Sequence, residues 1–220
     1  MEKEDVARDL QTEGAEGEEE MKKLIVLLML SLCSTANAAD FTANYDYLKQ
    51  PNKGNNYDDG QGYSLGIRHG IYRDIKGRLD VSHMTDINFP THVDVKGSFG
   101  ELRAYGAIYN LILDLPYNKN VSFNLSAGAG PMWWDFKENP HFQDSGVKVH
   151  VDPSVVLKAG AGMDIKIYDK WNVELGVGWM DTRIGKEVLS PGGERMNLLD
   201  ADDHINLRYI TYRIGVRKTF

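Results

Sequence analysis

Apolar and polar residues alternate with a period of two along most of the chain from Asp40 onward, and no long segment has the helical spacing i, i+3, i+4, i+7. In residues 154–167 every odd position is apolar, and Val156 is the one apolar residue at an even position. Residues 121–130 and 171–179 alternate in the same way, with glycine repeated on the polar face. Each glycine would cost a helix about 1 kcal/mol, so these segments are predicted to be strands.

Weaker alternation predicts strands at 41–47, 63–71, 79–83 and 210–220, and the segment 99–113 is apolar on both faces, so its register is left open. The connections predicted at 73–77, 114–120 and 168–170 are short and rich in turn residues. The other connections are polar stretches of about 10 to 22 residues, such as 49–60 and 184–205. Eight strands joined alternately by short and long connections predict an all-β fold, an antiparallel up-and-down barrel.

Two features indicate that the apolar face of the barrel points outward, toward lipid. The polar face consists mainly of Gly, Ser and Asn with scattered charges, which suits a crowded interior better than a water-exposed surface. Large aromatic residues stand at strand ends on the apolar face, as in the two interfacial girdles of membrane barrels. These residues are Trp171, Trp179, Trp133 or Trp134, Tyr47, Tyr212 and Phe220. The sequence therefore predicts an eight-stranded transmembrane β-barrel over residues 39–220.

The N-terminal 38 residues predict export. Residues 21–38 contain Met21 followed by two lysines, an apolar run and Ala36-Asn37-Ala38, which together form a signal peptide cleaved near Ala38. Residues 1–20 hold nine acids and two bases, and so account for the net charge of −7. We expect them to be an acidic disordered extension upstream of the true start at Met21.

Beyond the signal peptide the chain is nearly neutral and lacks cysteine, because the single cysteine is Cys33. Disulfide and thiol chemistry are thus not expected of the barrel. The balance of charges also argues against a nucleic-acid partner, since binding phosphates requires clustered Lys and Arg.

The signal peptide, eight alternating strands and terminal Phe220 resemble the small outer-membrane barrels of Gram-negative bacteria. Residues 159–182 (AGAGMDIKIYDKWNVELGVGWMDT) and 126–136 (SAGAGPMWWDF) are most similar to the OmpW family. The resemblance implies an outer-membrane location, contact with membrane lipid and lipopolysaccharide, and recognition of Phe220 by the barrel assembly machinery. Lys218 departs from the usual apolar residue third from the end.

Charged residues at inward positions are the candidate lumen lining. They are Arg68, Arg78, Asp80, Lys158, Asp164, Lys166, Glu174, Arg213 and Arg217. An eight-stranded barrel has room for side chains or one slim ligand, so these groups are expected to pair into a network. The OmpW-like interpretation implies a narrow conduit or binding barrel for small hydrophobic or amphipathic molecules, which leave sideways through the wall. The alternative is a sealed barrel that binds partners through its long loops.

Other chemistry is sparse, and no cofactor and no enzymatic activity are expected. Gly128-x-Gly130 and Gly160-x-Gly162 lack the third glycine and the helix of a phosphate loop. The run Asp200, Asp202, Asp203, His204 could hold a divalent cation, but a solvated loop is the favoured interpretation. A lipid A-modifying acyl hydrolase is a further alternative, since His83-Met84-Thr85 resembles the His-x-Ser pattern of lipid A deacylases. It has Thr in place of Ser and no assignable acid.

Overall fold

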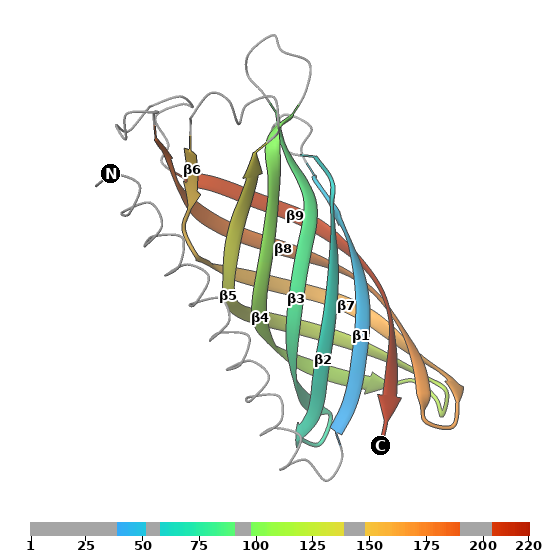
Figure 1. Cartoon of the computed structure of the whole chain (residues 1–220). Helices are drawn as coiled ribbons and strands as arrows, with labels where there is room; N and C mark the ends of the chain where they lie inside the picture. Colours follow the sequence, from blue (N-terminus) through green and yellow to red (C-terminus); the bar gives the residue numbers. More distant parts are fainter. Residues whose placement is uncertain (1–38, 52–57, 91–97, 139–147, 190–203) are drawn as a thin grey trace. The chain divides into compact units, whose positions relative to one another are not determined.

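A computed structural model describes residues 39–51, 58–90, 98–138, 148–189 and 204–220, and these residues form nine strands (Figure 1). The strands are β1 Ala39–Lys49, β2 Gly60–Tyr72, β3 Ile75–Pro90, β4 Ser98–Pro116, β5 Val121–Glu138, β6 Lys148–Val151, β7 Ser154–Tyr168, β8 Trp171–Leu189 and β9 His204–Thr219. In the described part of the chain no helix is long and apolar enough to cross a membrane.

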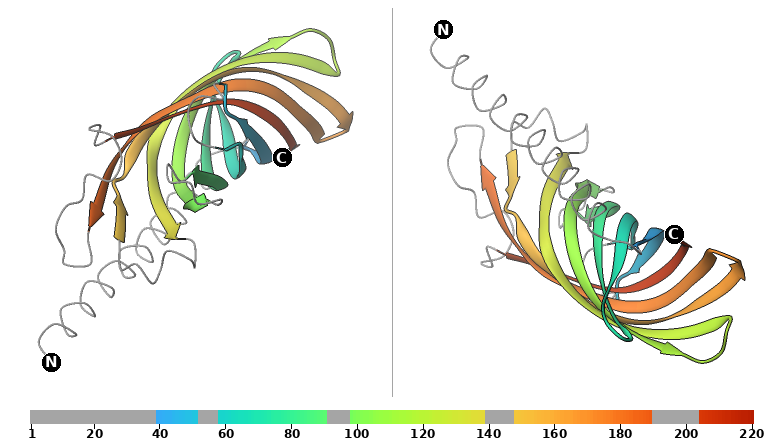
Figure 2. Two further views of the ribbon diagram at one scale, coloured as in Figure 1. Left: turned by 90° about the horizontal axis from the view of Figure 1, so that it is seen from above. Right: turned by 90° about the horizontal axis from the view of Figure 1, so that it is seen from below.

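Eight of these strands close a ring in which every neighbouring pair is antiparallel. The order is β1-β2-β3-β4-β5-β7-β8-β9, and β9 pairs back onto β1. Figure 2 shows β9 lying beside β1, where the ring closes. A closed ring leaves no unpaired sheet edge. The predicted eight-stranded antiparallel up-and-down barrel is therefore confirmed.

The barrel has two unlike ends. The β2–β3, β4–β5 and β7–β8 connections are the short turns after Tyr72, Pro116 and Tyr168, and we call this the turn end. We call the opposite end, where β1, β3, β5 and β8 end and β2, β4, β7 and β9 begin, the loop end. Both the start of β1 and the end of β9 are at the turn end, because Asp40 pairs with Thr219.

The outer wall is an apolar belt between two sets of aromatic residues. Lipid-facing positions such as Leu65, Leu125 and Ile214 are more than half exposed. Near the turn end Phe41 packs edge-on against Phe220 with ring centroids 5.3 Å apart, and toward the loop end Tyr45 lies 5.4 Å from Tyr63. Exposed apolar surface of this extent is unfavourable in water but matches a hydrocarbon layer.

The strands differ from the prediction at the loop end. The short strand β6, which pairs with the end of β8, was not predicted. Residues 184–189 form the end of β8 rather than part of a long loop, and β3 and β5 run on to Pro90 and Glu138. In these loop-end parts of the strands, polar and charged residues occupy the outer face beyond the aromatic belt. The alternation that predicts an apolar outer face therefore ends before the strands end.

Candidate functional site

The polarity of the inward-facing side chains changes at one level along the barrel axis. Apart from glycines and Ile112, inward residues on the turn-end side of this level are polar or charged, and most inward residues on the loop-end side are apolar. The change occurs between Asp46 and Leu48 in β1, Ser82 and Met84 in β3, Asn110 and Ile108 in β4, Lys158 and Val156 in β7, and Gly178 and Met180 in β8. The lumen thus has two compartments, one charged and one apolar.

The charged compartment is a network of ion pairs, which we call the charge network. Its carboxylates are Asp40, Asp46, Asp80, Asp114, Asp164 and Glu174, and its bases are Arg68, Lys76, Arg78, Lys158, Arg213 and Arg217. Positive and negative groups are equal in number in this set. A buried charge is tolerated when it is paired in this way.

Arg68 stands at the centre of the network near the turn end and is 1% exposed. It binds Asp114, lies 3.2 Å from Asp164 and is 3.7 Å from Glu174. Arg217 reaches two of the same acids, at 3.1 Å from Asp164 and 3.5 Å from Glu174. Two arginines from strands on different sides of β1 therefore share the carboxylates of β7 and β8.

A second part of the network lies nearer the middle of the barrel. Arg213 donates two hydrogen bonds to Asp46, at 2.7 and 2.8 Å, and Lys158 lies 3.7 Å from the same carboxylate. Arg78 bridges Asp80 and Glu174, both at 3.0 Å. The bidentate Arg213–Asp46 pair is the strongest geometry in this part of the lumen.

The structure gathers eight of the predicted lining residues in this network: Arg68, Arg78, Asp80, Lys158, Asp164, Glu174, Arg213 and Arg217. Lys166 differs, because its side chain is 42% exposed and pairs with Asp169 in the β7–β8 turn. The sequence reasoning missed Asp40, Asp46 and Asp114, which pair with five of the bases. Their even positions in β1 and β4 were a usable signal for the inward face.

The loop-end half of the lumen is filled by apolar side chains, and we call it the apolar compartment. Its buried members are Leu48, Met84, Ile87, Leu102, Ala104, Ile108, Met132, Trp134, Val151, Val156, Met180, Ile184, Ile205, Leu207 and Tyr209. This filling explains why residues 99–113 are apolar on both faces. Leu102, Ala104 and Ile108 face the compartment, whereas Tyr109 and Leu111 face outward.

A few polar groups inside the apolar compartment form hydrogen bonds with one another. The indole Nε1 of Trp134 donates to Ser154 Oγ at 2.8 Å, Ser154 Oγ lies 2.7 Å from Thr182 Oγ1, and Thr182 donates to the carbonyl of Val155 at 3.0 Å. This chain of hydrogen bonds ties β5, β7 and β8 together.

The ladder between β4 and β5 has a gap at the level where the two compartments meet. The register carries Gly106 opposite Met132 and Tyr109 opposite Ala129, with no bridge pair for Ala107 and Ile108 between them in this described ladder. Pro131 lies opposite Ala107 and has no amide hydrogen to donate. The floor of the apolar compartment is therefore bordered by a stretch of wall with fewer cross-strand hydrogen bonds.

The His83-x-Thr85 pattern lies on the outer wall near the loop end. The ring of His83 stacks on Tyr105 at 4.7 Å, and its Nδ1 has no hydrogen-bond partner within the described residues. Thr85 donates to Glu101 at 2.8 Å, so the nearby acid binds the hydroxyl and does not orient the imidazole. Hydrogen bonds from Arg103 lower the pKa of Glu101 to about 2, so Glu101 is a poor general base.

The candidate cation site falls largely outside the described residues, since Asp200, Asp202 and Asp203 precede β9 and the placement of the His204 side chain is not described. Across the described ranges no cluster of three or more His, Cys, Asp or Glu residues could hold a metal. Residues 1–38, with the predicted extension and signal peptide, are also outside the described part. Both Gly-x-Gly pairs lie inside strands β5 and β7 and not in loops.

No family model and no curated protein matches the chain. Solved structures match through the fold. The outer membrane protein OprG from Pseudomonas aeruginosa has a TM-score of 0.62 at 11% identity, covering 84% of this chain and 96% of that one. Neisserial surface protein A has a TM-score of 0.52 at 12% identity, covering 83% and 96%, and E. coli outer membrane protein W has 0.50 at 15%, covering 84% and 98%. The chain therefore has the fold of the eight-stranded outer-membrane barrels.

Proposed function

We propose that the chain is an outer-membrane barrel of a Gram-negative bacterium that takes small apolar or amphipathic molecules into its apolar compartment from the loop end. The division of the lumen carries this proposal. Apolar side chains that face a lumen cannot replace the water around a hydrated ion, but they do favour an apolar guest. Burial of each methylene group of such a guest contributes about 0.8 kcal/mol to its binding.

The charge network closes the route toward the turn end. Arg68, Asp80 and Asp164 are at most 2% exposed, and an apolar molecule that entered their region would have to separate desolvated ion pairs. A guest that does not return to the loop end therefore leaves sideways. We place this exit at the stretch of β4 and β5 around Ala107 and Pro131, where the ladder has a gap and Pro131 has no amide hydrogen to donate.

Three methionines support a compartment that can adapt to a guest. Met84, Met132 and Met180 are at most 1% exposed and face the compartment from β3, β5 and β8. Methionine side chains are flexible and polarisable, and they are used where a binding surface must repack. The matching outward residue, Met163, faces the lipid side of β7 and belongs to the outer wall.

A disulfide across the β4–β5 stretch tests the sideways route. In a Cys33→Ser background, Ala107→Cys with Pro131→Cys places two cysteines on facing positions of neighbouring strands, where Cα atoms are within disulfide range. We expect the oxidised barrel in liposomes to lose uptake of a hydrophobic fluorescent probe and to recover it on reduction. The control pair, Ala161→Cys with Val177→Cys, joins facing residues of β7 and β8.

Uptake that is equal in the oxidised and reduced Ala107→Cys/Pro131→Cys barrel would exclude the sideways route. Uptake that matches protein-free liposomes for every variant would instead favour the second candidate, a sealed barrel that acts through its loops. That candidate is supported by the tight filling of the compartment, where Leu102, Met132 and Leu207 are 0% exposed. The sealed-barrel candidate predicts that a variant with shortened loops loses binding to its partner.

The proposed partners of the outer wall and of the C-terminus follow from the outer-membrane assignment. Phe220 is 59% exposed on the outer face, so we propose that it is available to the barrel assembly machinery. Lys218, the atypical residue of this terminus, places its ammonium over the rings of Trp171 and Phe220, at 5.3 and 4.8 Å. This cation–π contact keeps the charge at the interface. Membrane lipid and lipopolysaccharide would surround the apolar belt.

A further inference from the structure

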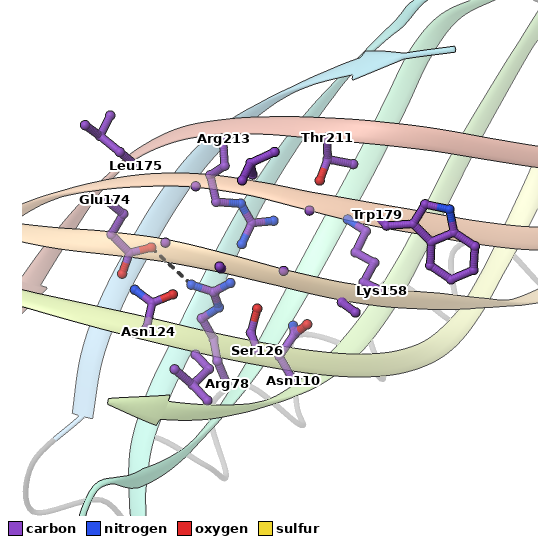
Figure 3. A pocket seen from close by; sticks show the side chains of 18 of the residues that line it. Arg78, Asn110, Asn124, Ser126, Lys158, Glu174, Leu175, Trp179, Thr211 and Arg213 are labelled. Carbon is purple, nitrogen blue, oxygen red and sulfur yellow. Dashed lines mark hydrogen bonds and ion pairs between the residues drawn. The ribbon is translucent and has the colours of Figure 1, made fainter. Parts of the chain in front are cut away.

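A small cavity of about 60 Å³ lies in the lumen beside the boundary of the two compartments, within the charged one (Figure 3). It has room for several water-sized particles. Four bases line it, Arg68, Arg78, Lys158 and Arg213, whereas Glu174 is its one carboxylate among the described residues.

The acids that balance these bases are set back from the cavity. Asp46, which holds Arg213 at 2.7 Å, and Asp80, which holds Arg78 at 3.0 Å, do not belong to its lining. Glu174 does, but three guanidinium groups surround it, with Arg78 at 3.0 Å, Arg217 at 3.5 Å and Arg68 at 3.7 Å. The lining therefore presents positive charge, although the charge network as a whole is balanced.

Lys158 is the base with the weakest protein partner. Its ammonium lies 3.7 Å from Asp46, which is beyond hydrogen-bond range, and its side chain is 12% exposed. In Figure 3 the Lys158 side chain lies between two groups of residues. Thr211 and Arg213 are on one side of it, and Ser126 and Asn110 are on the other. Arg68, which is 1% exposed, has an Nε without a hydrogen-bond partner in the described structure. Glu174 Oε1 also lacks a hydrogen-bond partner, but the lining as a whole carries four bases against this one carboxylate.

Inward glycines on β7 and β8 create the space, and these are Gly160, Gly162, Gly176 and Gly178. At Gly176 an added Cβ would meet its nearest heavy atom at 3.4 Å, an ordinary contact. A methyl group is therefore accommodated there and narrows the cavity. At Gly178 it would come within 2.8 Å of the carbonyl of Ala159, so that position tolerates only glycine.

We propose that this cavity binds a small monovalent anion of about the size of chloride, held by the Lys158 ammonium with help from Arg213 and the Thr211 and Ser126 hydroxyls. An anion brings an acceptor close to the Lys158 ammonium, whose carboxylate partner is 3.7 Å away, and offsets the surplus of positive charge in the lining. This site is separate from the apolar compartment and does not depend on the proposed uptake function.

The test compares the unfolding midpoint of the refolded full chain in sodium chloride with that in sodium gluconate at equal ionic strength. Chloride is expected to raise the midpoint, because a ligand bound only by the folded state stabilises it. Lys158→Met and Gly176→Ala should each weaken the apparent chloride affinity about tenfold or more, which corresponds to about 1.4 kcal/mol. Lys119→Met, which removes an exposed ammonium at the β4–β5 turn, should keep the full chloride effect.

Equal midpoints in the two salts for the unmodified chain would overturn the proposal, as would a chloride effect that survives in both Lys158→Met and Gly176→Ala. If Lys158→Met does not fold, crystals of the unmodified chain grown in sodium bromide decide the question. An anomalous peak beside the Lys158 ammonium supports the site, and the absence of a peak in the lumen overturns it.

Discussion

The two halves of the lumen are enclosed by the same eight strands but are stabilised by different physics. In the apolar compartment each side chain stabilises the fold through the apolar surface that it removes from water. The free energy of unfolding is therefore spread over many side chains with similar contributions. In the charge network the groups depend on their partners, and a single loss leaves a buried charge uncompensated. A barrel interior of this size can therefore combine a hydrocarbon-like core with an ionic plug, and the two should respond differently to substitution.

The largest expected effect is in the charge network. Arg68→Met removes one guanidinium that serves Asp114, Asp164 and Glu174, and should lower the free energy of unfolding by about 3–5 kcal/mol. Urea titration of the barrel in lipid vesicles measures this change. The matched control is Arg103→Met, which removes a guanidinium from a partly exposed ion pair with Glu101 at the loop end. Equal losses in the two variants would show that burial of the network contributes nothing.

A core truncation in the apolar compartment should come next. Leu102 is 0% exposed, so Leu102→Ala leaves a cavity and should cost about 3 kcal/mol. Leu111→Ala, on the lipid side of the same strand where Leu111 is 52% exposed, should cost less because lipid fills the space. The comparison uses the same urea titration, and a larger loss for Leu111→Ala would reverse the assignment of the two faces of β4.

The polar chain inside the apolar compartment predicts a smaller effect. Ser154→Ala leaves Trp134 Nε1 without its acceptor and Thr182 Oγ1 without its partner, which should cost about 1–2 kcal/mol. Tryptophan fluorescence should report the change at Trp134 as well. An unchanged stability and spectrum would mean that water replaces the serine, and that this region is wetter than its neighbours.

The smallest effect concerns a group outside the membrane-spanning belt. Arg103, together with Thr85, stabilises the ionised form of Glu101 and lowers its pKa to about 2. The contribution of this pair is thus present above the ordinary Glu pKa and is lost as the pH falls toward 2. A ¹³C NMR titration should find Glu101 still ionised near pH 4, and Arg103→Met should restore an ordinary midpoint. A normal midpoint in the unmodified chain would contradict the ion pair.

Sequence reasoning predicted the strand number of the ring and which face of most strands points outward, because alternation is strict where one face meets lipid. It also identified most of the charge network from inward parity, including Arg213 and Glu174. It did not identify the apolar compartment. Inward residues such as Leu102 and Val156 break the alternation, and without coordinates a strand with two apolar faces cannot show which one points inward. Nor could it pair the charges, since Arg68 meets Asp164 from a strand 96 residues away.

Methyl NMR of the refolded barrel, labelled at its methionine methyl groups, tests the central claim most directly, namely that the loop-end half of the lumen receives apolar molecules. Met84, Met132 and Met180 face the compartment, whereas Met163 faces the lipid side. On titration with a small apolar probe, the three lumen methyl signals should shift and saturate, and Met163 should follow only the partition of the probe into lipid. Movement of Met163 alone, with the lumen methionines unchanged at saturating probe, would contradict the account.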